Sequence, residues 1–185
     1  MRKPDGYDNA QAYTGEFEKI KPGGYICVIK NVREEATDKK WQLAIALDIA
    51  EGDSKDYYKQ RFDRFGGNWP AIYRQNIAGK DGRCSPFFKG MITAIEESNP
   101  DFTFRFEDEK CLVGKIFGGV FGEEEFVGSN GDTAVSCKCV QVRSVQAIRD
   151  GNFKIPDRKP LPAPAAAKPV SLDDFRDISI DDCPF

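Results

Sequence analysis

The 185-residue sequence contains no histidine, the side chain that most often serves as a general acid or base near neutral pH. It also lacks a phosphate loop of the form G-x-x-x-x-G-K-[ST] and a G-x-S-x-G nucleophile elbow. The acidic clusters at 107–109 and 123–125 are contiguous runs, a pattern more typical of a solvated turn than of a metal or acid-base site. We therefore expect a protein that is not an enzyme, with no catalytic residues, metal or cofactor.

Long hydrophobic runs are also missing. No apolar segment approaches the roughly 20 residues that a membrane helix needs. The first residues, MRKPDGYDNAQAYTG, contain no apolar stretch of about 7–15 residues such as a secretory signal has. These two absences predict a cytoplasmic protein with no membrane partner.

Paired C-x-x-C units are absent, although the chain has six cysteines, which are Cys27, Cys84, Cys111, Cys137, Cys139 and Cys183. Without a secretory signal a disulfide framework is not expected, and without histidine or C-x-x-C pairs a structural zinc site is not expected either. Cys137 and Cys139 are two residues apart and are predicted to lie on one face of a strand.

What the sequence has in abundance is aromatic rings, at 12% of all residues, and an uneven distribution of charge. The body (1–151) has 22 basic and 24 acidic residues, a net charge of −2. Residues 152–170 have a net charge of +3, and residues 171–185 have five aspartates and one arginine, a net charge of −4. The chain therefore divides into a nearly neutral body, a basic segment and an acidic end.

The segments outside the body have compositions that do not favour a packed core. Five of the nineteen residues in 152–170 are proline, and most of the others are small or basic, which predicts an extended linker. Residues 171–185 have too few apolar side chains to fold alone, so we expect a disordered tail that docks on a partner. Residues 1–22 are interpreted as an N-terminal extension, and 23–151 as one folded domain.

Three β-strands are predicted in the first part of the body. Segment 23–34 is rich in β-branched and aromatic residues, and 39–52 places bulky side chains at every second position. The alternating positions of the second segment, expected in the core, are Trp41, Leu43, Ile45, Leu47 and Ile49. Residues 34–39 are predicted to connect the two strands as a hairpin, and 56–65 is predicted as the third strand.

A helical insert is predicted at about 68–99, before the last strands. In 68–79, Pro70 suits a first helical turn, and 85–99 has apolar residues at helical spacing before Asn99-Pro100. Segment 110–127 is predicted as the fourth strand, a hairpin bending at its glycines, and 133–148 as the fifth. The order β-β-β-α-β-β predicts a mainly β fold with a helical insertion, the five-stranded antiparallel Greek-key barrel known as the OB-fold.

The predicted binding surface combines aromatic rings with cations on the third strand and just after it, and cations of the first strand and the first hairpin flank it. The second and third strands are the usual binding face of an OB barrel. Flat rings stack on unpaired bases, and cations contact the phosphates. The candidate DNA-binding residues are Lys30, Arg33, Lys39, Lys40, Tyr57, Tyr58, Lys59, Arg61, Phe62, Arg64, Phe65, Trp69, Tyr73 and Arg74. Each ring could equally belong to the core. Phe87 and Phe88 are predicted to pack within the helix, and the acidic runs are predicted to lie on the opposite side of the body.

The end of the sequence, Asp181-Asp182-Cys183-Pro184-Phe185, resembles the end of bacterial and phage single-stranded DNA-binding proteins. These proteins have an OB body, a flexible linker and an acidic tip that finishes in Pro-Phe. The segments PGGYICVIKNV, GGNWPAIYRQN and FFKGMITAIEESNP resemble members from phages and mobile elements of Gram-positive bacteria. The resemblance covers the whole chain, although Cys183 stands where isoleucine is more usual and the helical insert is longer.

The resemblance implies a protein of the bacterial cytoplasm that coats single-stranded DNA with little sequence specificity during replication, recombination or repair. It implies that the tip recruits enzymes through the tail residues Asp177, Asp181, Asp182, Cys183, Pro184 and Phe185. Whether the chain forms a homo-oligomer is left open. A strand-annealing recombination mediator is the alternative function, followed by an adaptor that binds only proteins and, more distantly, a nuclease.

Overall fold

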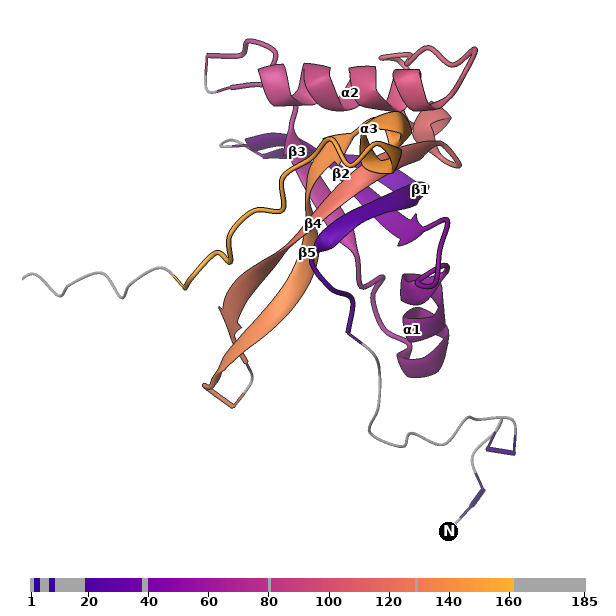
Figure 1. Cartoon of the computed structure of the whole chain (residues 1–185), viewed down its shortest axis with the longest axis vertical. Helices are drawn as coiled ribbons and strands as arrows, with labels where there is room; N and C mark the ends of the chain where they lie inside the picture. The colour runs from indigo at the N-terminus through magenta and orange to yellow at the C-terminus, as the bar shows by residue number, and fades with distance from the viewer. Residues whose placement is uncertain are drawn as a thin grey trace, which may run out of the picture.

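The protein is mainly β, a five-stranded antiparallel sheet with helical insertions (Figure 1). This computed structural model describes residues 2–3, 7–8, 19–37, 40–79, 81–128 and 130–161. The elements are β1 (Gly23–Thr37), β2 (Lys40–Ile49), α1 (Tyr57–Phe65), β3 (Ile72–Asn76), α2 (Pro86–Ser98), the 3₁₀ helix η1 (Glu109–Leu112), β4 (Ile116–Val127), β5 (Thr133–Arg143) and α3 (Val145–Arg149). The predicted tail (171–185) and Lys39 lie outside the described residues.

The sheet has the order β3-β2-β1-β4-β5, and every neighbouring pair is antiparallel. It is open, with β3 and β5 as its edges, and does not close into a barrel. The strands predicted at 23–34 and 39–52 are confirmed as β1 and β2. The bulky side chains of β2 are buried from Leu43 to Ile49 as predicted, but Ala44 and Asp48 on the other face are buried as well, so β2 is not a half-buried strand. Trp41, expected in the core, is 45% exposed and donates a hydrogen bond from its indole to Glu34.

The prediction of a third strand at 56–65 is wrong, because this segment forms helix α1. The buried carboxylate of Asp48 fixes the start of the helix by accepting hydrogen bonds from the amides of Tyr58 (2.9 Å) and Lys59 (3.1 Å). The helix ends at Gly66, whose positive φ of 65° suits glycine and whose amide bonds to the carbonyl of Phe62. The ring positions in this segment fit both a period of two and a helical period, so the alternation was ambiguous.

The prediction of a helix at 68–79 is also wrong, since this segment contains strand β3. β3 pairs with β2 from Gln42↔Asn76 to Ala46↔Ile72. The preceding loop is fixed by the Trp69 indole, which donates to the carbonyl of Leu47 at 2.9 Å. Pro70 therefore precedes a strand here, a position that proline tolerates as well as a first helical turn.

The helix predicted at 85–99 is confirmed as α2, with Pro86 in its first turn. Its apolar face buries Phe88, Met91, Ile92 and Ile95 in the core. Phe87, expected to pack with Phe88, is instead 78% exposed.

The segment predicted as a hairpin at 110–127 instead forms η1 followed by a single strand, β4. The hairpin is formed by β4 and β5, whose pairing reaches Val127↔Thr133. Figure 1 shows this hairpin projecting from the sheet on the same side as α1, while α2 covers the opposite end. The rest of the segment predicted as the fifth strand, after Arg143, forms the short helix α3.

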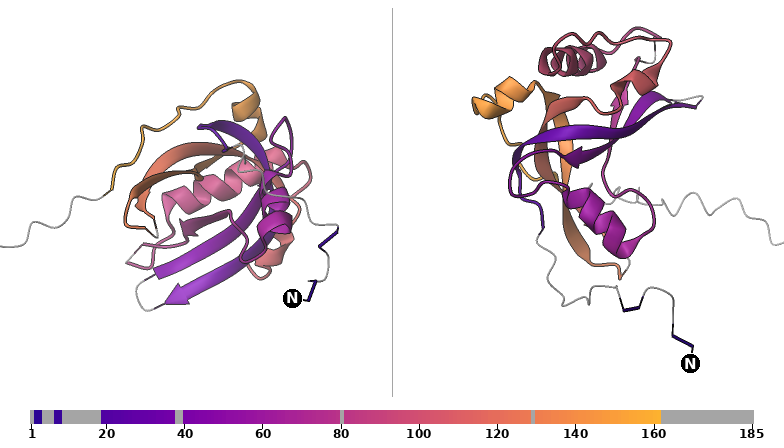
Figure 2. Two further views of the ribbon diagram at one scale, coloured as in Figure 1. Left: turned by 90° about the horizontal axis from the view of Figure 1, so that it is seen from below. Right: turned by 90° about the vertical axis from the view of Figure 1, so that its right-hand side faces the viewer.

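Residues 152–161 are the described part of the linker predicted at 152–170. This segment, which we call the strap, runs back from α3 along β4 (Figure 2). Lys159 donates its amide to the carbonyl of Glu123 and accepts from the amide of Glu125, both at 2.9 Å. The strap is mostly exposed, but it is hydrogen-bonded to β4 as far as Leu161.

The acidic run 123–125 belongs to β4 and is not the solvated turn that the sequence predicted. Its carboxylates are half-buried. Glu123 and Glu124 pair with cations of β5 and the strap, and Glu125 accepts a hydrogen bond from the amide of Leu161.

No helix in the described parts of the chain is long and apolar enough to cross a membrane.

Candidate nucleic-acid interface

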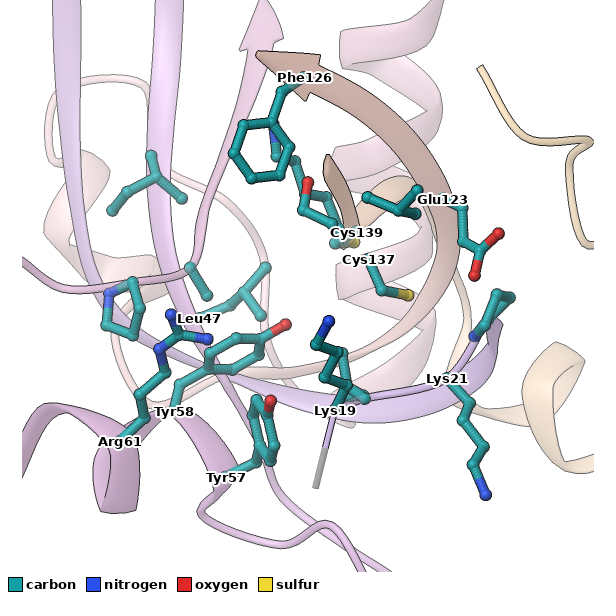
Figure 3. A pocket seen from close by; sticks show the side chains of 18 of the residues that line it. Lys19, Lys21, Leu47, Tyr57, Tyr58, Arg61, Glu123, Phe126, Cys137 and Cys139 are labelled. Atoms are coloured by element: carbon teal, nitrogen blue, oxygen red, sulfur yellow. The ribbon is translucent and has the colours of Figure 1, made fainter. Parts of the chain in front are cut away.

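A groove of about 960 Å³ separates the edge strand β3 and helix α1 from the β4–β5 hairpin (Figure 3). Three further segments reach it, namely residues 19–22 before β1, the loop before β3 and the strap. Its lining includes Lys19, Ile20, Lys21, Pro22, Leu47, Tyr57, Tyr58, Arg61, Pro70, Ala71, Ile72, Arg74, Glu123, Phe126, Ala134, Val135, Ser136, Cys137, Lys138, Cys139 and Arg158. The groove thus follows the opening between the two edges of the sheet.

The lining of the groove has six cations and one carboxylate, and two further carboxylates, Glu35 and Glu124, pair with lining cations from beside it. The cations come from the segment before β1 (Lys19, Lys21), from α1 (Arg61), from β3 (Arg74), from β5 (Lys138) and from the strap (Arg158). Figure 3 shows Lys19 pointing into the groove and Lys21 pointing away from it. The body's net charge of −2 therefore conceals a local excess of positive charge on one surface.

On the β3 side, Glu35 of β1 positions the arginine that faces the groove. Its carboxylate accepts from Arg74 at 3.0 Å and from Arg33 at 2.6 Å. The hydrogen bonds from Arg74 and then from Arg33 lower the pKa of Glu35 below its usual value. Arg33 and Arg74 are held on one face because both pair with Ala44 of β2, whose small side chain leaves them room.

On the hairpin side, two glutamates of β4 position the cations. Glu123 pairs with Arg158 at 2.8 Å, and Glu124 pairs with Lys138 at 3.0 Å and with Lys159 at 2.9 Å. Hydrogen bonds from Lys159 and then from Lys138 lower the pKa of Glu124. A competing phosphate could replace either glutamate as the partner of these exposed cations.

Two of the three rings in the groove are partly exposed. Tyr57 is half-buried at the start of α1, and Phe126 of β4 is 41% exposed at the far side. Tyr58 is buried, which raises its pKa well above the usual value, and it contacts Tyr57 edge to face at 5.0 Å between centroids. Tyr58 therefore supports Tyr57 from below and does not itself present a flat face.

Two thiols of β5, Cys137 and Cys139, also line the groove, and they lie on one face of the strand as their spacing predicts. Burial raises the pKa of Cys137 to about 11 and that of Cys139 to about 12, so both are neutral at physiological pH. The described residues contain no group of three or more histidine, cysteine or carboxylate side chains placed to bind a metal ion.

A second hollow of about 450 Å³ continues the groove past the start of α1. It shares Lys19, Ile20, Lys21 and Tyr57 with the groove and adds side chains that are mostly polar. Those additional residues are Tyr25, Asp53, Ser54, Lys55, Gln60 and Arg64. An extended anionic ligand can therefore follow one continuous path around the end of α1.

The structure brings five of the predicted DNA-binding residues to this path. Tyr57, Tyr58, Arg61 and Arg74 line the groove, and Arg64 lines the second hollow. Their helical arrangement, rather than the predicted strand, places Tyr57, Arg61 and Arg64 on one side of α1, because residues three and four apart are neighbours on a helix.

Other predicted residues lie elsewhere in the described structure. Phe62 packs against Trp69 at 5.4 Å between centroids, and Tyr73 is half-buried with its hydroxyl donating to Gln75. Lys59 pairs with Asp63, and Phe65 is 54% exposed at the end of α1 near Arg64.

The predicted cations of β1 and β2 lie outside the two hollows. Lys30 is exposed at a bulge between Ile29 and Asn31, Arg33 pairs with Glu35, and Lys40 is exposed at the start of β2.

Sequence reasoning missed five side chains of the groove, which are Lys19, Lys21, Phe126, Lys138 and Arg158. Lys19 and Lys21 flank Ile20 shortly before β1. This pair of cations is a usable signal, but residues 1–22 are interpreted as an extension outside the domain. Phe126 and Lys138 depend on the hairpin register, and Arg158 depends on the strap folding back. No local pattern in the sequence indicates either.

No family model matches the sequence, and none of the curated proteins compared with it matches significantly.

Proposed function

We propose that this protein binds single-stranded DNA with little sequence specificity and takes part in phage or mobile-element replication or recombination. The observation that carries the proposal is the groove, whose lining combines six cations, five of them besides Lys21, with two partly exposed rings. Single strands are bound by such a combination, because cations contact the phosphates and each stacked base contributes about 1–3 kcal/mol whatever its identity. A nuclease would need a catalytic cluster, and nothing in the groove suggests one.

The connectivity of the sheet supports an OB-type fold. A Greek key has the spatial order 4-1-2-3, and β4-β1-β2-β3 follow that order. An OB-fold is a partly open barrel of this kind that binds oligonucleotides beside its second and third strands and its β1–β2 and β4–β5 loops. The groove lies beside β3 and the β4–β5 hairpin, which is consistent with that mode of binding.

We further propose that the acidic segment 171–185 recruits replication, recombination or repair proteins. This segment lies outside the described residues, so the support is its sequence alone, five aspartates with interspersed apolar side chains. Binding through such a segment is weak, reversible and sensitive to salt. When DNA is absent, the segment also competes for the cationic groove. Deleting 176–185 should then tighten DNA binding at low salt, and unchanged binding would count against this competition.

The proposal is tested by fluorescence anisotropy with labelled oligo-dT of increasing length, alongside a matched duplex. We expect the single strand to bind, with the logarithm of the association constant falling linearly as the logarithm of the salt concentration rises. The duplex should bind more weakly. Failure to bind oligo-dT at low ionic strength would refute the function. Faster pairing of two complementary oligonucleotides in the same buffer would favour the annealing alternative.

A further inference from the structure

The strap is held to the body by three kinds of contact. Its backbone hydrogen bonds to β4 at Glu123 and Glu125, as described above. Arg158 and Lys159 pair with Glu123 and Glu124. Its apolar side chains pack against glycines of the sheet, where a larger residue would leave them no room. These contacts hold the strap in one position.

Two strap side chains pack directly against glycines, as the distances from an added Cβ atom show. A Cβ at Gly24 of β1 would lie 2.5 Å from the ring of Phe153, and one at Gly122 of β4 would lie 2.6 Å from Pro156. Real Cβ atoms do not approach other atoms so closely, so a larger residue at either position requires Phe153, Pro156 or the strand itself to shift.

The seated strap changes the charge of the groove. Glu123 is the one carboxylate among the lining residues, and Arg158 both pairs with it and lines the groove. Without Arg158, the lining would have five cations and an uncompensated carboxylate facing the path of a phosphate backbone. Both changes oppose binding of a polyanion, since one removes attraction and the other adds repulsion.

We propose that the strap is part of the DNA-binding site, where Arg158 contacts a phosphate and neutralises Glu123. This inference rests on the proposed function and extends it to a segment beyond the predicted domain. The binding unit accordingly includes at least residues 152–161, and lifting the strap weakens binding without any change in the other groove residues.

The first test compares two substitutions of strap cations in the full-length protein. R158Q should weaken oligo-dT binding about fivefold at 0.1 M salt and reduce the salt slope by about 0.7, the effect of one lost phosphate contact. K154Q makes the same change in net charge at an exposed strap residue that does not line the groove, and should change binding less than twofold. Equal effects of the two substitutions would overturn the role of Arg158.

The second test lifts the strap without altering a charge. G122A should displace Pro156 and weaken binding at least as much as R158Q, whereas G90A, at an α2 glycine with open space around it, should not. F153A removes the anchor at Gly24 without adding atoms and should act in the same direction. Trypsin cleavage after Arg158, measured without DNA, reports whether the strap has been lifted. A lifted strap with unchanged binding would overturn the inference.

A double-mutant cycle separates the two contributions of Arg158. In an E123Q background no carboxylate remains to be neutralised, so R158Q should cost less than it does in the wild type. Equal costs in both backgrounds would remove the neutralising role. If the wild type itself fails to bind oligo-dT, the proposed function fails as a whole. If the wild type binds and the strap variants bind equally well, only the inference about the strap fails.

Discussion

The two walls of the groove are held in place by different physical means. Helix α1 forms one wall, which we call the α1 wall. It depends on buried contacts, since Asp48 caps the helix from the core and Tyr58 is buried there. The β4–β5 hairpin forms the other wall, which we call the hairpin wall. It depends on partly exposed ion pairs of Glu123 and Glu124 with Lys138, Arg158 and Lys159. Salt screens exposed pairs much more than buried contacts. Added salt should therefore loosen one wall while leaving the other intact.

The largest effect is expected from breaking the α1 wall at its cap. D48A leaves the amides of Ile49, Tyr58 and Lys59 without their acceptor in a buried site, and should lower the free energy of unfolding by about 3 kcal/mol. Urea denaturation measures this loss. The control is D63A, at an exposed residue of the same helix, and a comparable loss there would contradict the buried cap.

A smaller effect, on binding alone, is expected from the ring on the α1 wall. Y57A should weaken oligo-dT binding by about 1–3 kcal/mol, the cost of one lost stacked base. F65A removes an exposed ring from the same helix outside the groove and should leave affinity nearly unchanged. Anisotropy titrations compare the two, and equal losses would show that Tyr57 has no special position.

The hairpin wall can be examined through its thiols. Because the pKa of Cys137 is raised to about 11, its thiolate fraction rises about tenfold per pH unit between pH 8 and 10, and its labelling rate should follow. Saturating oligo-dT should slow the labelling of Cys137 and leave that of the exposed Cys84 unchanged. Mass spectrometry of the labelled peptides gives both rates. Equal protection of the two cysteines would argue against DNA lying in the groove.

The smallest effect is expected from the ion pairs of the hairpin wall. The pKa of Glu124 is lowered in the folded state, so its contribution to stability is present above its ordinary value and is lost as pH falls through the lowered one. E124Q should therefore lower stability by at most about 1 kcal/mol at pH 7, and the difference should shrink as the pH falls below the ordinary pKa of glutamate. Thermal denaturation over a series of pH values tests this, and a difference that grows as the pH falls would contradict the assignment.

The sequence predicts an element of this fold well where the spacing of its bulky side chains fits a single period, and poorly where long-range contacts decide. The spacing in β2 and that in α2 each fit one period, and both elements are confirmed. Segment 56–65 fits two periods, and the deciding contact comes from Asp48, a residue in another element. The same limit applies to the groove, because Phe126, Lys138 and Arg158 reach it through strand register and the path of the strap.

The open edges of the sheet have a consequence for how the protein can be handled in solution. An edge strand presents unpaired backbone groups to other copies of the chain, and natural proteins discourage such pairing with charged side chains. Arg74 on β3 and Lys138 on β5 stand at these edges. The cations that we assign to phosphates therefore also guard against self-association. Variants that neutralise several of them should be checked for aggregation before any weaker binding is attributed to DNA contacts.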